Sequence, residues 1–413
     1  MDTQLLLVFW GCTVLGATAG LMGSSAFLEK KSLLTDGLSH ALLPGLVLGY
    51  WISQSKDLPF LLVGAALSSA IGAWLSDFLQ KNSKLSSDAA IGIVLGGFFG
   101  LGTLFLSALQ HAESGNQSGL DQFLFGKAAS LGVQHVLIIS VVCILLVCHF
   151  VYHYREVKIY LFDPVYAQTA GISSKRISRL LLGSYILTAA IGVQAVGAIL
   201  ISSMLILPSV AARMWGSTFK GMIAIAVSIG AFGALAGCYI SAKFAHMPTG
   251  PVVVLVLGSI VLISLFVNPA NGWIKKWSLK TIRRWQISSE NQLKAAYLHI
   301  ERNYHPSSRS EYLAHPITLA GYFNRYAQLR GWIVRRSQSW YFSEQGLVCA
   351  ESVVRKHRLW ELYLNKHLQL HPNHVHLSAE WMEHFLGPRE EKVLMNLLDQ
   401  PLADPHSKQI PPL

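Results

Sequence analysis

The sequence predicts an all-α polytopic membrane domain of about nine transmembrane helices, followed by a smaller, mostly α-helical unit in water. Of its 413 residues, 52% are hydrophobic and only 13% are charged, whereas soluble proteins carry about a quarter charged residues. Long apolar runs alternate with short polar joints up to Asn268 and then stop. Residues 271–413 contain 19 Lys and Arg against 12 Asp and Glu, so they supply +7 of the net charge of +11.

Apolar runs long enough to cross about 30 Å of hydrocarbon predict the membrane helices. The sixth and seventh runs are contiguous, so they form either two spans or one span and a re-entrant segment. Basic residues gather in the joints after the odd-numbered spans, which places these joints in the cytoplasm and the N-terminus outside. Nine spans then place the C-terminal unit in the cytoplasm. The expected spans are 5–23, 38–53, 58–79, 89–109, 134–153, 179–197, 198–212, 219–240 and 249–268.

The segment SLLTDGLSHALLPG places an acid and an imidazole, Asp36 and His40, four residues apart at the start of an apolar run. In a helix these side chains lie on one face, about one turn apart. An ionisable pair at a membrane helix is costly and is rarely kept without a function. Carboxylate and imidazole together suit Mn, Fe or Zn. The pair predicts a path for a divalent metal; an aspartate at a helix start beside a surface histidine is the alternative.

Two cytoplasmic stretches, FDPVYAQTAGISSKR and LPSVAARMWGS, are either interfacial loops or docking surfaces for a soluble partner. The first predicts a short helix between an Asp-Pro and a glycine, and the second places a proline at the expected end of a span. The chain has no G-x-x-x-x-G-K-[ST] phosphate loop. ATP-driven transport would therefore need a separate ATPase chain, and this chain is not expected to be an enzyme. The residues predicted to couple to an ATPase are Asp163, Ala167, Gly171 and Pro208.

Residues 1–268 resemble the ABC-type manganese/zinc/iron permeases over nearly their whole length. The resemblance implies a second permease subunit, identical or different, a cytoplasmic ATP-binding subunit and an extracytoplasmic metal-binding lipoprotein, at the inner membrane of a bacterial cell. It also implies that Asp36 and His40 lie on the route of the ion. The stretches that carry it are SLLTDGLSHALLPGLVLG, SSDAAIGIVLGGFFGLG, FDPVYAQTAGI and GVQAVGAILISSMLILPSVAARM.

Residues 269–287 form a basic, Trp-containing linker, expected to be unstructured and suited either to the membrane surface or to solvent. Residues 288–347 are expected to form a winged-helix-like domain, with a helix, a turn at Gly331 and two strands around a Ser-Gln-Ser turn. This order suits DNA binding through a groove-facing helix and a basic hairpin. The residues expected to face DNA are Asn324, Arg325 and Gln328 on the helix, and Arg335 and Arg336 on the hairpin.

Residues 348–413 contain two stretches rich in His and Glu. RKHRLWELYL places an imidazole and a carboxylate four residues apart, and HVHLSAEWMEHFL places two imidazoles and two carboxylates on one helical face. Such groups converging from two helices repel one another or leave charge unpaired unless a cation holds them. Solvated His and Glu on separate helices are the alternative, and the spacing does not fit a metalloprotease. The candidate ligands are His357, Glu361, His376, Glu380, Glu383 and His384.

These stretches, with the ending DPHSKQIPPL, resemble the metal-binding and dimerisation part of the diphtheria-toxin-repressor family of iron- or manganese-dependent regulators. The resemblance implies one metal site with three ligands and a second site with three more. Glu380 stands where iron regulators have Cys, which favours manganese. The resemblance assigns His357, Glu361 and His376 to one site, and Glu380, Glu383 and His384 to the other.

Two positions on the first helix of this half depart from the family. Asn291 replaces a Met or Asp ligand, and Lys294 replaces the Glu of manganese regulators. The helix before the expected DNA-reading helix is also shortened. We expect that the metal site either loses its link to the DNA-reading helix or uses the amide oxygen of Asn291.

Two functions follow from these features. In the first, a permease that imports Mn, Fe or Zn is fused to a dimeric metal-dependent repressor that binds operator DNA. The linker then predicts release of the repressor by cleavage. In the second, the C-terminal part is a metal sensor that gates the permease and never binds DNA.

Overall fold

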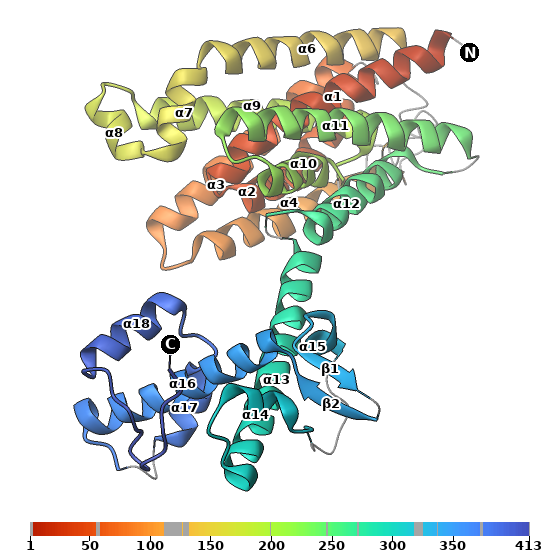
Figure 1. Ribbon diagram of the computed structural model, residues 1–413. Helices are drawn as coiled ribbons and strands as arrows, with labels where there is room; N and C mark the ends of the chain where they lie inside the picture. The colour runs from red at the N-terminus through yellow and green to blue at the C-terminus, as the bar shows by residue number, and fades with distance from the viewer. Residues whose placement is uncertain are drawn as a thin grey trace. The chain divides into compact units, whose positions relative to one another are not determined.

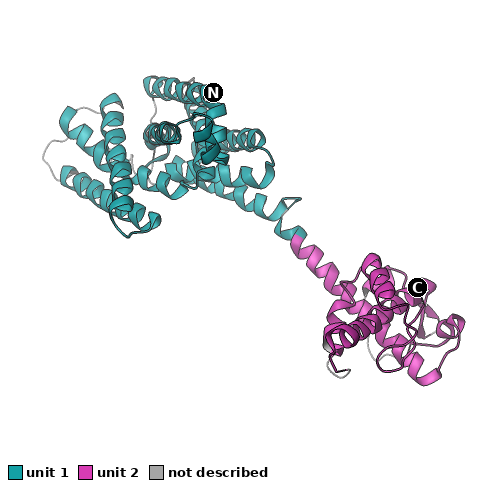
Figure 2. Ribbon diagram, turned by 90° about the vertical axis from the view of Figure 1, so that its left-hand side faces the viewer, with its two compact units in different colours: residues 1–275 teal, residues 276–413 magenta. Residues whose placement is uncertain are grey.

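The chain divides into two compact units, Met1–Lys275 and Lys276–Leu413 (Figure 2). The division falls within the segment expected to link the two halves. The structure is a computed structural model that describes residues 3–54, 58–110, 126, 132–198, 200–244, 247–270, 272–317, 325–336, 338–371 and 375–412 (Figure 1).

Each of the nine runs expected to cross a membrane coincides with a helix in the described part of unit 1. Seven of these helices are long and apolar enough to cross a membrane; α2 and α10 are the other two. The nine are α1 (Thr3–Leu28), α2 (Ser32–Ser53), α3 (Leu58–Asn82), α4 (Ser87–Gln110), α6 (Val133–Tyr152), α9 (Ser174–Val196), α10 (Ile201–Trp215), α11 (Phe219–Lys243) and α12 (Thr249–Val267).

The contiguous sixth and seventh runs are divided at Gly197. This residue ends α9 with a φ of +96°, a conformation that a side chain would strain. The helix that follows, α10, has 15 residues, fewer than the roughly 20 needed to cross the hydrocarbon. The apolar stretch therefore forms one long helix and one short helix.

Small residues let the membrane helices pack backbone against backbone. Gly16 and Gly20 of α1 face Gly230 and Ala226 of α11, and a Cβ added at Gly16 would lie 2.3 Å from the carbonyl oxygen of Gly230. Between α2 and α3, Gly45 meets Gly64 in the same way. In lipid, where apolar side chains gain little by leaving the solvent, such close approach supplies the packing that holds helices together.

Two short helices, α7 (Tyr154–Phe162) and α8 (Pro164–Thr169), connect α6 to α9. The Asp163 carboxylate caps α8 by accepting a hydrogen bond from the backbone N–H of Tyr166 at 2.8 Å. Gly171 follows with a φ of +78°. This is the short helix bounded by Asp-Pro and Gly that the sequence predicted.

Unit 2 contains the helix, the turn at Gly331 and the two strands that the sequence predicted, in that order. The two strands are antiparallel, with Ile333 opposite Phe342 and Arg336 opposite Ser339. Its elements are α13 (Trp273–Tyr304, which begins before the division), α14 (Arg309–Ala314), α15 (Arg325–Leu329), β1 (Ile333–Arg336), β2 (Ser339–Phe342), α16 (Glu344–Leu368), α17 (His376–Met382) and α18 (Pro388–Leu397).

The linker prediction was wrong in one respect: residues 273–287 are not unstructured but form the first half of α13. No Gly or Pro interrupts the sequence between Trp273 and Tyr304, and its Lys, Arg, Gln and Leu are good helix formers. In the linker part, Trp273, Trp277 and Trp285 are exposed beside Lys and Arg.

A buried arginine fixes α16 against its neighbours in unit 2. Arg358 donates a hydrogen bond to Glu301 of α13 at 2.6 Å, lies 3.6 Å from Asp404 and donates to the backbone oxygen of Gln409. With only 2% of its surface exposed, Arg358 keeps its charge through these partners. The helix that carries two candidate metal ligands is therefore rigidly placed.

Candidate metal sites

Asp36 and His40 lie one turn apart on α2, as their spacing required. His40 Nε2 is 3.7 Å from Asp36 Oδ1, too far for a hydrogen bond. The His40 ring packs edge-on against Phe99 of α4, with 5.2 Å between centroids. Its Nδ1 is buried without a hydrogen-bond partner among the described residues. Both side chains therefore keep lone pairs available for a cation.

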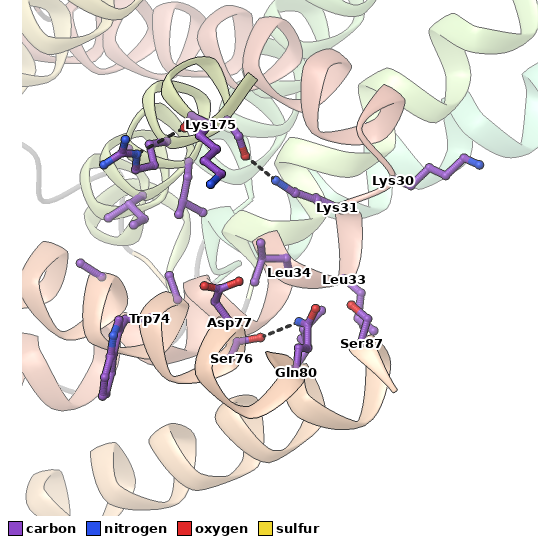
Figure 3. A pocket seen from close by; sticks show the side chains of 18 of the residues that line it. Lys30, Lys31, Leu33, Leu34, Trp74, Ser76, Asp77, Gln80, Ser87 and Lys175 are labelled. Atoms are coloured by element: carbon purple, nitrogen blue, oxygen red, sulfur yellow. Dashed lines mark hydrogen bonds between the residues drawn. The ribbon is translucent and has the colours of Figure 1, made fainter. Parts of the chain in front are cut away.

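A separate open pocket of about 840 Å³ lies among the ends of α2, α3, α4 and α9 (Figure 3). Its lining includes five basic and two acidic side chains. The Lys31 ammonium donates a hydrogen bond to Ser178 at 2.9 Å and pairs with Glu29. The excess positive charge repels a divalent cation, so this pocket is poorly suited to the metal.

The four residues expected to couple to an ATPase do not form one surface. Asp163, Ala167 and Gly171 belong to α8 and its flanks, and Ala167 is buried. Pro208 is buried inside α10, which continues to Trp215. The sequence placed Pro208 at the end of a span; the helix instead passes through it, which membrane helices tolerate when neighbours satisfy the freed backbone groups.

In unit 2, His357 and Glu361 of α16 meet His376 of α17. One ligand atom from each residue lies within 4.8 Å of the others. His357 Nε2 is 3.0 Å from Glu361 Oε1, and His376 Nδ1 forms an ion pair with the same oxygen. The Glu361 side chain is 2% exposed, whereas that of His376 is 51% exposed, which leaves one side of the cluster open to an incoming ion.

Burial and pairing act in opposite directions on the charges of this cluster. Burial disfavours a charged His357, but the contacts with Glu361 and Glu383 outweigh it and raise the pKa of His357. Burial also disfavours a charged Glu361, but the neighbouring His357 outweighs it and lowers the pKa of Glu361. The carboxylate is therefore held in the ionised form that a metal requires.

The donor set fits a divalent transition metal. Two imidazoles and a carboxylate suit Mn, Fe or Zn. Glu361 Oε1 is buried, and the ring nitrogens of His357 and His376 approach it without hydrogen-bond geometry. Buried carboxylate oxygens normally have hydrogen-bond partners, so a cation between these three side chains would satisfy this oxygen.

The other three candidate ligands do not form a second group of converging donors among the described residues. Glu383, directly after α17, accepts a hydrogen bond from Lys294 of α13 at 2.6 Å and lies 2.6 Å from His357 Nδ1. Glu380 of α17 is exposed and makes no ion pair with the described residues.

His384 is held by α13 instead. Its Nδ1 lies 2.6 Å from Glu290 Oε2, and its Nε2 lies 2.9 Å from Asn291 Oδ1. The amide oxygen of Asn291, expected as a possible metal ligand, thus contacts an imidazole. Sequence reasoning missed Glu290: its spacing of four residues from Lys294 places the two on one helical face but does not indicate a contact with His384.

Of the residues expected to face DNA, Asn324 lies outside the described residues and Arg325 begins α15. Gln328 is exposed on α15. Arg335 and Arg336 are exposed on β1, where their guanidinium groups lie over Trp340 and Tyr341 of β2 at 5.9 and 5.6 Å. The aromatic rings support the arginines without neutralising them.

Comparison with known families assigns both halves. Residues 1–268 match the family model described as ABC 3 transport family. The chain belongs to the ABC 3 transport family. Residues 343–412 match the model of the iron dependent repressor, metal binding and dimerisation domain. This ABC 3 family member thus carries a C-terminal region that matches the metal-binding and dimerisation domain of iron-dependent repressors, and both sequence resemblances are confirmed.

Relatives of this ABC 3 permease include manganese and zinc transport proteins. It is 34% identical over 376 residues to the manganese transport system membrane protein MntC of Bacillus subtilis (strain 168), covering 89% of this chain and 85% of that protein. It is 35% identical over 271 residues to the zinc transport system membrane protein TroC of Treponema pallidum (strain Nichols), covering 66% and 91%. The structure of PsaBC from Streptococcus pneumoniae in complex with Fab matches with a TM-score of 0.60 and 27% identity, over 67% of this chain and 95% of that one.

Proposed function

We propose that this chain is the transmembrane subunit of an ATP-driven importer of divalent metal, with a cytoplasmic C-terminal repressor that responds to the same metal. Manganese or iron is the preferred ion, and zinc suits the same ligands. The observation that carries the proposal is the cluster of His357, Glu361 and His376, in which two imidazoles converge on a buried carboxylate and one ligand atom of each residue lies within 4.8 Å of the others.

The import function rests on the pair at α2 and on the relatives. Asp36 and His40 offer an oxygen and a nitrogen that no hydrogen bond joins. Transport proteins for manganese and zinc are similar to this chain over most of their length. The ion reaches the pair from an extracytoplasmic lipoprotein, between this chain and a second permease subunit in the bacterial inner membrane.

The ATPase partner docks at α8. Val165 and Tyr166 of this short helix are exposed, and the Asp163 cap and Gly171 hold the helix as a compact projection. Exposed apolar side chains on a projection between two basic stretches suit a protein partner. Pro208, inside α10, contributes to packing within unit 1 instead.

The repressor function rests on the metal cluster together with the basic hairpin. Arg335 and Arg336 project from β1 with aromatic support, an arrangement suited to phosphate contacts. Metal binding at α16 and α17 orders the dimeric state in which two such hairpins meet operator DNA.

A second function, gating of transport without DNA, is favoured by α13 and α14. One uninterrupted helix of 32 residues begins at Trp273 and carries Glu290, Asn291 and Lys294 beside the candidate metal ligands. The helix α14, which precedes the expected DNA-reading helix, has only six residues. Metal in the sensor would then alter the permease through α13.

Two measurements test the proposal and separate the two functions. Uptake of radioactive manganese by cells expressing the chain with its ATPase tests import, and uptake independent of Asp36 and His40 contradicts it. Retention of the full chain on duplex DNA at increasing salt tests repression. A repressor requires metal and shows a steep salt dependence; a gating sensor shows no retention, but its transport rate falls when cytoplasmic metal rises.

A further inference from the structure

The two ring nitrogens of His357 face two different carboxylates. Nε2 lies 3.0 Å from Glu361 Oε1, and Nδ1 lies 2.6 Å from Glu383 Oε2. A histidine that binds metal through one nitrogen commonly donates its other N–H to a carboxylate, which fixes its tautomer. Glu361 Oε1 is approached by His357 Nε2 and His376 Nδ1, but neither contact has hydrogen-bond geometry. A metal on Nε2 would therefore leave the proton on Nδ1, from which it would be donated to Glu383 Oε2.

Lys294 occupies the far side of this arrangement. Its ammonium donates a hydrogen bond to Glu383 Oε2 at 2.6 Å and lies 2.9 Å from His357 Nδ1. The Glu383 side chain has no exposed surface and that of Lys294 has 12%. A carboxylate this deeply buried needs a cation, and Lys294 already supplies it. A divalent ion between Glu383 and His357 Nδ1 would have to displace the ammonium.

The remaining imidazole is also engaged. His384 uses one nitrogen with Glu290 and the other with Asn291, so neither nitrogen is left for a metal. Together, Lys294 and these two α13 residues engage Glu383 and His384, two of the three groups from which a second metal site would be built.

We propose that Lys294 is a built-in cation of the regulatory site, so that the C-terminal unit binds one divalent ion per chain, on His357 Nε2, Glu361 and His376. Glu383 then orients His357 instead of binding metal. This inference rests on the regulatory metal site of the proposed function and sets its stoichiometry.

The test uses the full chain in detergent with Asp36 and His40 both changed to Ala, which removes the candidate ligands of the membrane half. Manganese is titrated, and bound ions are counted by elemental analysis and by electron paramagnetic resonance. The parent binds one ion per chain, with the spectrum of an isolated Mn²⁺. Lys294→Glu removes the ammonium and adds an oxygen ligand beside Glu383, so it binds two ions with an exchange-coupled spectrum.

Two matched variants show whether loss of a lysine charge acts only at position 294, beside Glu383, or anywhere on α13. Lys294→Met keeps the single ion but binds it about tenfold more weakly, because Glu383 loses its cation and orients His357 less well. Lys280→Met makes the same change at an exposed position of the same helix and leaves both number and affinity unchanged. Thermal melting of each variant shows whether it is folded.

Two bound ions with a coupled spectrum in the parent overturn the inference, as does a folded Lys294→Glu variant that still binds one isolated ion. If Lys294→Glu does not fold, the count in the parent and the weakening in Lys294→Met decide. A parent that binds no ion removes the regulatory site itself, and this inference with it, which is a different result from a count of two.

Discussion

The two candidate metal-ligand groups of this chain are built differently. Asp36 and His40 come from consecutive turns of one helix. By contrast, His357, Glu361 and His376 come from two helices, and the two imidazoles converge on the buried carboxylate of Glu361. Two ligands on one helix bind an ion on one side only, so that it exchanges readily. Three ligands that converge hold it longer. The first geometry suits passage of an ion, and the second suits measuring its concentration.

The largest expected effect is a loss of manganese uptake that leaves manganese binding at the C-terminal group unchanged. Changing Asp36 and His40 to Ala reduces manganese uptake to the level of cells without the protein, because the route loses both donors. Uptake of radioactive manganese measures this. Binding of manganese to the C-terminal unit stays unchanged.

The matched control is Asp88→Ala at the start of α4, an exposed acid in the same half. It keeps normal uptake. Equal loss in this control would mean that negative charge in general, not the ligand pair, supports transport.

The next-largest expected effect is a loss of manganese affinity at the C-terminal group alone. Glu361→Gln lowers manganese affinity roughly 100-fold, at the upper end of losses seen when metal-site partners are removed, because a neutral amide replaces the central carboxylate. Titration of the full chain in the Asp36→Ala/His40→Ala background measures it. Glu380→Gln, an exposed change of the same kind, has no effect; a comparable loss there would restore Glu380 as a ligand.

Lowering the pH reduces the manganese affinity of the C-terminal group by less than the Glu361→Gln change does. The raised pKa of His357 means that a proton competes with metal at a higher pH than at an ordinary histidine, whose pKa is about 6.5. Below the raised pKa, affinity for manganese falls about tenfold per pH unit for this one proton. Titrations between about pH 8 and pH 6 measure the slope.

The pH dependence of stability in the metal-free protein has the opposite sign to that of manganese affinity. Protonated His357 contributes stability that is fully present below its ordinary pKa and is lost as pH rises through the raised value. Bound metal restores stability on the alkaline side. A melting temperature of the metal-free chain that increases from pH 6 to pH 8 would count against this arrangement.

The smallest effect concerns the hairpin. Changing Arg335 and Arg336 to Ala lowers the salt slope of DNA binding by about two, one for each phosphate contact, and leaves manganese binding unchanged. Fluorescence anisotropy with a duplex at several salt concentrations measures the slope. An unchanged slope would favour the gating function.

Local patterns in the sequence predicted the features that depend on local spacing. The nine apolar runs coincide with helices, and the i, i+4 spacing alone placed His40 over Asp36 and Glu361 over His357. The partners of Glu383 and His384 could not be predicted, because α13 lies far away in the sequence and no periodicity specifies which of its residues they meet. The linker was misjudged because its basic composition suggested disorder, whereas residues 273–287 contain no Gly or Pro to interrupt a helix. Pro208 was misjudged because a proline was expected to end the span, whereas membrane helices tolerate proline in their interior.

The glycine contact between α1 and α11 has a mechanical consequence. The Gly230 carbonyl occupies the space that any side chain at position 16 would need, so the two backbones pack directly against each other and a larger residue there would push the helices apart. We expect α1 and α11 to move together as one rigid body when the membrane unit opens and closes. The short α10 is joined to α1 as closely, because a Cβ added at Gly23 of α1 would lie 1.7 Å from the carbonyl oxygen of Leu205 of α10. A movement that exposes an ion first to one side and then to the other would therefore have to come from segments outside α1, α10 and α11.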